Sequence, residues 1–171
     1  MKEIETKFKV SSLKEVRTKL KSMKAELVWQ GLENNTYFDR AGHSLKNQDA
    51  SLRLRSWSGH SNTMTLKVDP KRQNKKYKIR EELQVIISDL DTTAAILKKL
   101  GFTPSSGYSK KREHWKLPDA SIELDTINGI CFVEIEAEKV VIDRLAKELG
   151  LDWKNSTTKS YVAILEEMKK R

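Results

Sequence analysis

Charged side chains stand at every second position near the start of the chain. In the stretch EIETKFKV they are Glu3, Glu5, Lys7 and Lys9. Side chains of a β-strand point alternately to its two faces, so a strand here would have one charged face and one mostly apolar face. Charged faces are commonly solvated, and this strand alone favours that interpretation. The alternative is a site where two carboxylates bind a metal ion and two amines bind an anion.

The same alternation occurs in the other predicted strands, and the charges are sorted by sign. Bases dominate the middle strands, at Arg53, Arg55, Lys67, Lys78, Arg80, Lys110 and Arg112. Acids dominate the first strand and the last two, at Glu3, Glu5, Glu123, Asp125, Glu134 and Glu136. Ordinary surfaces mix the two signs, and the arginine guanidinium matches the geometry of phosphate oxygens. Periodicity alone favours a sandwich with solvated charges, whereas the sorting favours charged faces that point inward.

Inward-facing cations in a confined space repel one another unless a polyanion lies among them. A triphosphate is such a polyanion, and it is long enough to meet several strands at once. Carboxylates beside it would repel its phosphates unless Mg²⁺ or Mn²⁺ lay between them. These cations take oxygen ligands and bridge carboxylates to phosphates.

Eight strands and a few helices must position these residues. Alternation and turn residues predict strands at residues 2–10, 36–39, 51–57, 64–68, 76–87, 109–117, 121–125 and 131–138. Helical spacing of apolar residues predicts helices at 11–27, 88–101, 140–150 and 160–170. Ser12 and Glu15 fit a capping box, and Gly101 and Gly150 suit the left-handed position after a helix. The pattern predicts an α+β protein with a closed or nearly closed eight-stranded antiparallel β-barrel and helices packed outside.

A short internal repeat suggests that the barrel has two similar halves. The stretch EIETKFKVSSL aligns with REELQVIISDL at an offset of 77 residues, which places Glu5 over Glu82. Both stretches precede a predicted helix. Gln84 stands where Lys7 stands in the first half, so the second half does not duplicate the lysine.

Composition narrows the class of protein. The chain has 171 residues, 33% charged and 37% hydrophobic, which is typical of a soluble domain, and we expect one domain spanning 1–171. It contains no apolar run long enough to span a membrane and no recognisable signal peptide, which predicts a cytoplasmic protein without a membrane partner. Cys131 is the single cysteine, so a metal site must use carboxylates or histidines. The net charge of +9 indicates an anionic partner, which could be nucleic acid, a phosphorylated small molecule or an acidic surface.

The order of the motifs resembles the CYTH superfamily, also called triphosphate tunnel metalloenzymes. EIETK fits its E-x-E-x-K signature, and TYFD, LRLR, TLK, REE, KKRE, ELD, FVEIE and KSY follow in the expected order. The arrangement is most similar to class IV adenylyl cyclases and their thiamine triphosphatase relatives. The resemblance implies an eight-stranded antiparallel tunnel with a charged interior, a Mg²⁺ or Mn²⁺ cofactor and a triphosphate substrate.

The resemblance also implies roles for individual residues. The metal ligands would be Glu3, Glu5, Asp125, Glu134 and Glu136. The triphosphate would be bound by Lys7, Arg53, Arg55, Lys67, Arg80, Lys110 and Arg112. The catalytic residues would be Glu5, Lys7, Lys110 and Glu136. The chain departs from the family pattern before FVEIE, where Gly129 is the one glycine of a turn that is often glycine-rich.

Three functions follow from these interpretations. The first is a cyclase that converts ATP into cyclic AMP and pyrophosphate, and the second is a triphosphatase that hydrolyses thiamine triphosphate or tripolyphosphate. The third, from another class, is a nucleic-acid or polyphosphate binding protein, which only the net charge favours. The paired glutamates argue against nucleic acid, because they would repel its backbone without a metal. A homodimer is an open alternative to a monomer.

Overall fold

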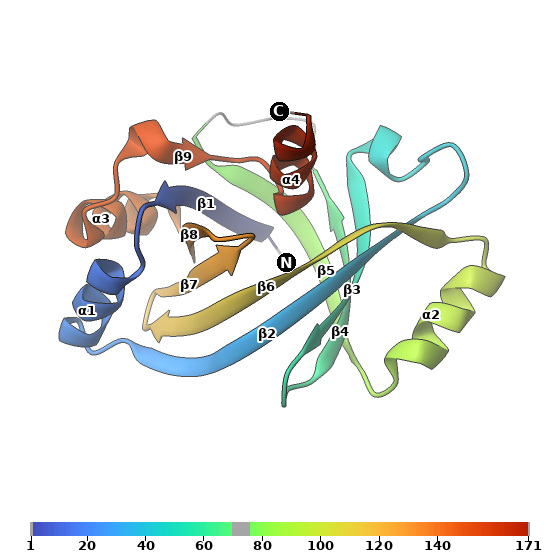
Figure 1. Ribbon diagram of the computed structural model, residues 1–171, viewed down its shortest axis with the longest axis horizontal. Helices are drawn as coiled ribbons and strands as arrows, with labels where there is room; N and C mark the ends of the chain where they lie inside the picture. The colour runs from blue at the N-terminus through green and yellow to red at the C-terminus, as the bar shows by residue number, and fades with distance from the viewer. Residues whose placement is uncertain (1, 70–75, 171) are drawn as a thin grey trace.

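The computed structural model shows a closed antiparallel β-barrel with helices on its outside (Figure 1). It describes residues 2–69 and 76–170. The strands are β1 (Lys2–Val10), β2 (Glu26–Asp39), β3 (Ala50–Trp57), β4 (Asn62–Val68), β5 (Lys78–Ile87), β6 (Thr103–Leu117), β7 (Ala120–Ile127), β8 (Ile130–Ala137) and β9 (Ser156–Thr157). The helices are α1 (Lys14–Ser22), α2 (Leu90–Lys99), α3 (Lys139–Leu149) and α4 (Tyr161–Lys169), with 3₁₀ turns at Lys46–Gln48 and Trp153–Asn155.

Neighbouring strands follow the order β5-β4-β3-β2-β6-β7-β8-β1, and β5 also pairs with β1. Within the described ranges, eight strands therefore close into a ring, and each pair of neighbours is antiparallel. The short β9 pairs with β1 at Lys7 and Phe8, beyond the contact with β5. The predicted α+β class and the eight-stranded barrel are confirmed.

The ring closes at a short seam between β1 and β5. These strands pair through four positions, from Lys2 opposite Glu81 to Glu5 opposite Lys78. In contrast, β2 and β6 pair through thirteen positions of the described chain. The seam therefore has far fewer backbone contacts than the opposite wall, and it carries Glu3 and Glu5.

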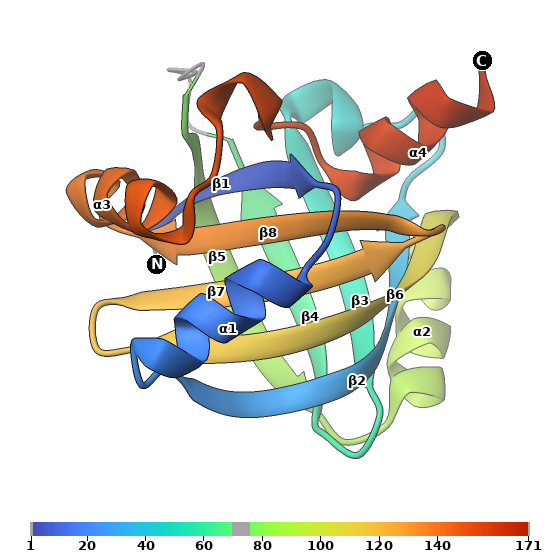
Figure 2. The same cartoon turned by 60° about the vertical axis from the view of Figure 1, so that its left-hand side comes forward.

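Two helices cover the outward-facing apolar side chains of β1, β7 and β8 (Figure 2). Leu20 of α1 and Leu145 of α3 are fully buried there against residues such as Phe8 and Ile135. Burying a side chain of this size contributes roughly 1.5–3 kcal/mol. Because the apolar faces pack under helices, the charged faces of the same strands point into the barrel.

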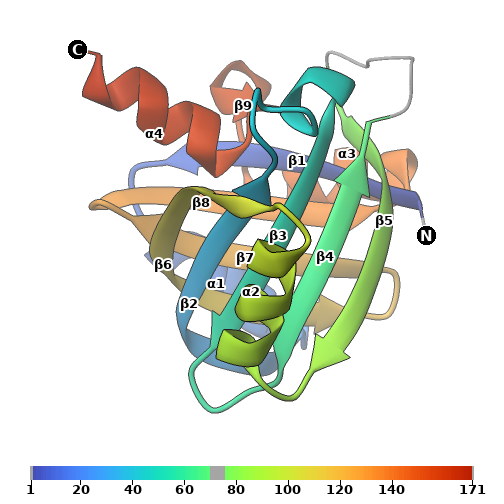
Figure 3. The same ribbon diagram turned by 90° about the vertical axis from the view of Figure 1, so that its right-hand side faces the viewer.

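The other helices complete the cover. Leu97 of α2 packs on Leu52 and Leu54 of β3 (Figure 3). The Asp89 carboxylate caps α2 by accepting a hydrogen bond from the backbone N–H of Thr92. The first residue of α4, Tyr161, is buried in a third apolar cluster. No helix in the described part of the chain has the length and apolar content that crossing a membrane requires.

The structure corrects several predicted boundaries. The helix predicted at 11–27 ends at Ser22, and β2 begins at Glu26, so Leu27 belongs to a strand. Ser12 and Glu15 form no capping box, because the N-cap is Leu13 and no side chain caps it. The strands predicted at 36–39 and 109–117 are the later parts of β2 and β6. Their first parts form a long pairing with each other, a non-local contact that outweighs local propensity.

The two halves of the chain have the same succession of elements. Each has a strand, a helix and a long strand: β1, α1 and β2 in the first half, and β5, α2 and β6 in the second. Glu26 opens β2 and Thr103 opens β6, which is again an offset of 77 residues. The geometry thus agrees with the repeat in the sequence.

Candidate active site

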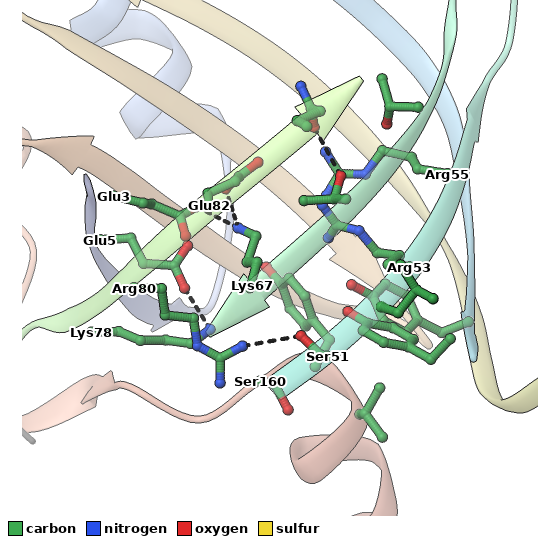
Figure 4. Close-up of a pocket in the computed structure, with 18 of the residues that line it drawn as sticks. Glu3, Glu5, Ser51, Arg53, Arg55, Lys67, Lys78, Arg80, Glu82 and Ser160 are labelled. Carbon is green, nitrogen blue, oxygen red and sulfur yellow. Dashed lines mark hydrogen bonds and ion pairs between the residues drawn. The ribbon is translucent and has the colours of Figure 1, made fainter. Parts of the chain in front are cut away.

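The interior of the barrel is a cavity of about 940 Å³, lined largely by charged and polar side chains. Its lining includes the predicted site residues Glu3, Glu5, Lys7, Arg53, Arg55, Lys67, Arg80, Lys110, Arg112, Glu134 and Glu136. Asp125 is fully buried and does not line the cavity. Glutamates of β1 lie on one side of the cavity and arginines of β3 on the other (Figure 4). The prediction that the charged faces point inward is confirmed.

Glu3 and Glu5 point into the cavity from the seam. Lys67 Nζ donates a hydrogen bond to Glu3 Oε1 at 2.5 Å, and Lys78 Nζ donates one to Glu5 Oε1 at 2.6 Å. Glu136 lies opposite Glu5 on β8, and no ion pair of the described residues involves it. One of the three carboxylates is therefore without a cation beside it.

These acids repel one another. Glu136 is exposed to the cavity, yet partial removal from water and the charges of nearby glutamates, above all Glu123, raise its pKa to about 8. Burial and the charge of Glu5 also raise the pKa of Glu3. Burial acts in the same direction on Glu5, but the charges of Lys78, Lys7 and Lys67 together outweigh it and lower the pKa of Glu5 to about 2. Either a proton or a cation can relieve this repulsion.

A buried network of ion pairs joins β1, β6, β7 and β8. Lys7 Nζ donates to Glu134 Oε1 at 2.5 Å. The Arg112 guanidinium donates to Glu134 at 2.5 Å and to both oxygens of Asp125 at 2.6 Å. Burial acts to raise the pKa of Glu134, but Lys7 and Arg112 hold it well below its usual range. Glu134 is therefore ionised and already bonded to two bases.

The Asp125 carboxylate accepts hydrogen bonds from bases that line the cavity and so fixes their orientation. Besides Arg112, Lys110 Nζ donates to its Oδ2 atom at 2.9 Å, and the Tyr161 hydroxyl donates to the same atom at 2.6 Å. The Tyr161 ring lies under Lys7 and Lys110, whose Nζ atoms are 4.5 and 4.4 Å from its centroid. The structure thus places Asp125 among the bases rather than beside the glutamates of β1. Its role as a metal ligand stays a prediction.

Arg53 and Arg55 extend from β3 toward the glutamates. Arg53 is buried, its Nε atom has no hydrogen-bond acceptor, and no described carboxylate lies within ion-pair distance of it. Arg55 Nε donates to Asn35 Oδ1 at 3.2 Å and lies 3.5 Å from Glu33 Oε1. Arg53 is therefore a cation whose charge no neighbouring acid pairs directly.

The other predicted phosphate ligands, Lys67 and Arg80, are held by acids of β1, β5 and the end of β4. Lys67 Nζ lies between Glu3 and Glu82, at 2.5 and 2.8 Å. Arg80 Nε lies 2.5 Å from Asp69 Oδ1. Both bases line the cavity, so a phosphate group would have to compete with these acids for them.

Sequence reasoning missed residues of β2 that lie among the bases Arg53, Arg55, Lys110 and Arg112. We call this part of the cavity the base side of the barrel. Glu33 and Asn35 are buried beside the bases, and Tyr37 lines the cavity. They stand on alternate positions, which is the signal that could have identified them. The predicted strand began at residue 36, so Glu33 and Asn35 lay outside it and were not assigned to a face of the sheet. His114 also lines the cavity, with its Nδ1 atom 3.0 Å from Glu123 Oε1.

The acids supply the donor set that a hard divalent cation requires. Glu3 Oε2 is buried and accepts no hydrogen bond from the described residues, and Glu136 has the raised pKa described above. Carboxylate oxygens suit Mg²⁺ and Mn²⁺. Within residues 2–69 and 76–170, no three acidic, histidine or cysteine side chains already converge as a metal site. Lys67 and Lys78, which hold Glu3 and Glu5, would have to release them when a cation binds.

Fold and site together define a class of protein. Proteins of this class are closed antiparallel barrels with acidic and basic side chains in the interior. Such an interior can hold a polyanion together with a metal ion. The model of the CYTH domain matches residues 1–161. The chain belongs to the CYTH family.

Individual relatives agree with this assignment. The chain is 29% identical to a protein of Methanocaldococcus jannaschii named "Putative adenylate cyclase", over 96% of this chain and 98% of that protein. It is similar to the solved structure of the PH1819 protein from Pyrococcus horikoshii, with a TM-score of 0.80, 27% identity and 99% of each chain covered. A Hippeastrum structure, described as an adenylyl cyclase candidate with a dominant triphosphatase activity, shares the fold. Its TM-score is 0.70 at 18% identity, covering 97% of this chain and 96% of that one.

Proposed function

We propose that this chain is a divalent-metal-dependent enzyme that acts on a triphosphate, and that it converts ATP into cyclic AMP and pyrophosphate. The observation that carries the substrate class is the opposition of acids and bases across one cavity. Family membership and the name of the Methanocaldococcus jannaschii relative support the cyclase reaction. A cytoplasmic location and a homodimer stay predictions.

In this proposal the bases bind and orient the phosphates. Arg53 forms no ion pair with a described acid and its Nε atom has no acceptor there, so a phosphate oxygen would supply the charge-assisted hydrogen bond that this atom lacks. Lys110 and Arg112, held by Asp125, would face the same phosphates from β6, which only β2 separates from β3. Positive charge fixed at these positions stabilises the negative charge that develops on the leaving pyrophosphate.

The acids Glu3, Glu5 and Glu136 would hold the metal, with Glu134 beside them. A bound Mg²⁺ or Mn²⁺ polarises phosphate oxygens and lowers the pKa of an attacking hydroxyl group. In the cyclase reaction the ribose 3′-oxygen attacks the α-phosphorus, its proton passes to solvent, and the bond from this phosphorus to the leaving pyrophosphate oxygen breaks.

The second candidate is a triphosphatase, in which water attacks the terminal phosphorus of thiamine triphosphate or tripolyphosphate. It is supported by the number of strands that supply bases to the cavity, β3, β4, β5 and β6, since such a set would bind phosphates without selecting one phosphorus. The described activity of the Hippeastrum protein, which shares the fold, lies in the same direction. A shift of the substrate along the cavity would exchange one reaction for the other.

The test is a product analysis with purified protein. The protein is incubated with Mg²⁺ or Mn²⁺ and, in separate reactions, with ATP, thiamine triphosphate and tripolyphosphate. Cyclic AMP, pyrophosphate and orthophosphate are then separated and quantified. Glu136→Gln serves as the inactive variant, and Glu113→Gln, on the outward face of β6, serves as the active control.

Cyclic AMP and pyrophosphate in equal amounts from ATP support the cyclase. Orthophosphate without cyclic AMP, with tripolyphosphate cleaved faster than ATP, overturns it in favour of the triphosphatase. Binding of polyanions without turnover, weakening steeply with salt, overturns both and favours a nucleic-acid or polyphosphate binding protein.

A further inference from the structure

Glu33 is an acid buried completely in the base side of the barrel. Its side chain is 0% exposed, although it carries a charge. Three bases surround its carboxylate: Arg55 Nε at 3.5 Å, Lys110 Nζ at 3.4 Å and Arg112 Nη1 at 3.6 Å. Asn35 Nδ2 donates a hydrogen bond to its Oε1 atom at 2.9 Å. One carboxylate therefore meets three of the predicted phosphate ligands at once.

The contacts of Glu33 differ from those of the neighbouring acid Asp125. Arg112 and Lys110 approach Asp125 to between 2.6 and 2.9 Å, within hydrogen-bond distance. They remain 3.4 to 3.6 Å from Glu33, whose Oε2 atom accepts no hydrogen bond from the described residues. Glu33 thus acts on the bases mainly through its charge. Phosphate oxygens could share these bases without first breaking short hydrogen bonds to Glu33.

An internal anion at this place solves a problem that the fold creates. Arg53, Arg55, Lys110 and Arg112 are close enough for their charges to repel, and burial weakens the screening by water. Burial and the charge of Arg112 lower the pKa of Lys110, and Glu33 opposes this change. Asp125 and Glu134 already counter the charges of Lys110 and Arg112, but among the described acids only Glu33 also lies within ion-pair distance of Arg55.

We propose that Glu33 is a positioning residue, an internal counter-anion that holds Arg55, Lys110 and Arg112 in their phosphate-binding arrangement while the barrel contains no phosphate. This role rests on the proposed function, because it assumes that these bases bind a triphosphate. It has two opposite effects. Glu33 lowers the affinity for the polyanion, since its charge repels phosphate, and it raises the rate of reaction, since it keeps the bases in place.

Glu33→Gln separates these effects, because glutamine keeps the size of the side chain and the acceptor for Asn35 but removes the charge. Tripolyphosphate binding is measured by calorimetry without metal, and thermal unfolding is measured with and without tripolyphosphate. We expect the variant to bind tripolyphosphate about tenfold more tightly, because a buried like charge near the ligand is gone. We also expect a lower melting temperature without ligand and a larger increase when ligand is added.

Steady-state kinetics give a third readout. In Glu33→Gln both KM and kcat should fall, each by about tenfold, because the phosphates bind more tightly to bases that are less well oriented. Glu33→Asp keeps the charge and should restore the affinity of the unaltered protein. The matched control is Glu113→Gln, since Glu113 also lies on a barrel strand and pairs with an arginine, Arg17, but on the outside.

Unchanged or weaker tripolyphosphate binding in Glu33→Gln overturns the inference, as does an equal effect in Glu113→Gln. If Glu33→Gln does not fold alone, refolding with tripolyphosphate replaces the binding measurement: recovery supports the inference and failure to recover overturns it. Tighter binding by the variant, with no turnover in either protein, removes the proposed function and leaves the role of Glu33 intact. Turnover in both proteins, with equal tripolyphosphate binding, supports the proposed function and overturns the role of Glu33.

Discussion

Glu5 and Glu136 lie opposite each other on the antiparallel strands β1 and β8, and both line the interior of the barrel. Like charges that face each other across a strand pair destabilise it unless something lies between them. Lys78 pairs with Glu5, whereas no described base pairs with Glu136. The register of the two strands therefore creates a place for a cation.

The first prediction concerns these two carboxylates. Glu5→Gln and Glu136→Gln should each abolish turnover and leave the fold intact, because each removes a carboxylate ligand from the proposed metal site and nothing from the apolar core. Product formation and circular dichroism measure the two parts of this prediction. Full activity in both variants would show that the glutamates are solvated charges without a catalytic role.

The second prediction contrasts two bases. Arg53→Ala and Lys110→Ala should each lower kcat/KM by about ten- to a hundredfold, the effect of one lost charge-assisted phosphate contact. Their effects on stability should have opposite signs. Arg53 forms no ion pair with a described acid and its charge repels that of Arg55, so removing Arg53 should raise the melting temperature.

Removing Lys110 leaves the buried acids Asp125 and Glu33 with one base fewer, so the melting temperature of Lys110→Ala should fall. From the sequence alone, the loss of either base would be expected to raise stability, and the ion pairs of Lys110 change that expectation. Differential scanning calorimetry without ligand measures both variants. A fall of equal size in the two would contradict the contrast.

A third prediction follows from the raised pKa of Glu136. The folded, metal-free protein holds a proton on this group up to about pH 8, whereas the unfolded chain loses it near the usual value of 4.5. The folded state therefore binds more protons in this window, and the contribution of Glu136 to the free energy of unfolding falls as pH rises from about 4.5 to about 8. Urea unfolding in EDTA should show the stability of Glu136→Gln increasing relative to the unaltered protein over this range. A difference that does not change with pH would contradict the assignment.

The fourth prediction links this proton to the metal. Since Glu136 is largely protonated near pH 7 and a metal ligand must be ionised, binding of Mg²⁺ or Mn²⁺ should release a proton. Calorimetry in two buffers with different ionisation enthalpies counts the protons released. Release should be absent from Glu136→Gln, and equal release from both proteins would assign the proton to another group.

The period-two pattern separated the charged face of each strand from its apolar face, because a strand has only two sides. It did not show which face points inward; the sorting of the charges by sign over β1, β3 and β6 favoured the charged faces, and these line the cavity. The pattern did not identify Glu33, since the first part of β2 has no strong local strand signal and is extended by pairing with β6. It also could not show that Asp125 lies among bases. That placement depends on the register between β6 and β7, which sets Asp125 opposite Arg112.

The short seam between β1 and β5 links the proposed metal site to the stability of the barrel. Four paired positions join the two ends of the sheet, and Glu3 and Glu5 stand on them. Local opening of a sheet begins where the fewest hydrogen bonds must break, so this seam is where amide hydrogens should exchange with deuterium most easily. A cation bound by Glu3, Glu5 and Glu136 would link β1 firmly to β8 and quench the repulsion that loosens this strand. The same carboxylates would then stabilise the closed barrel as well as take part in its chemistry.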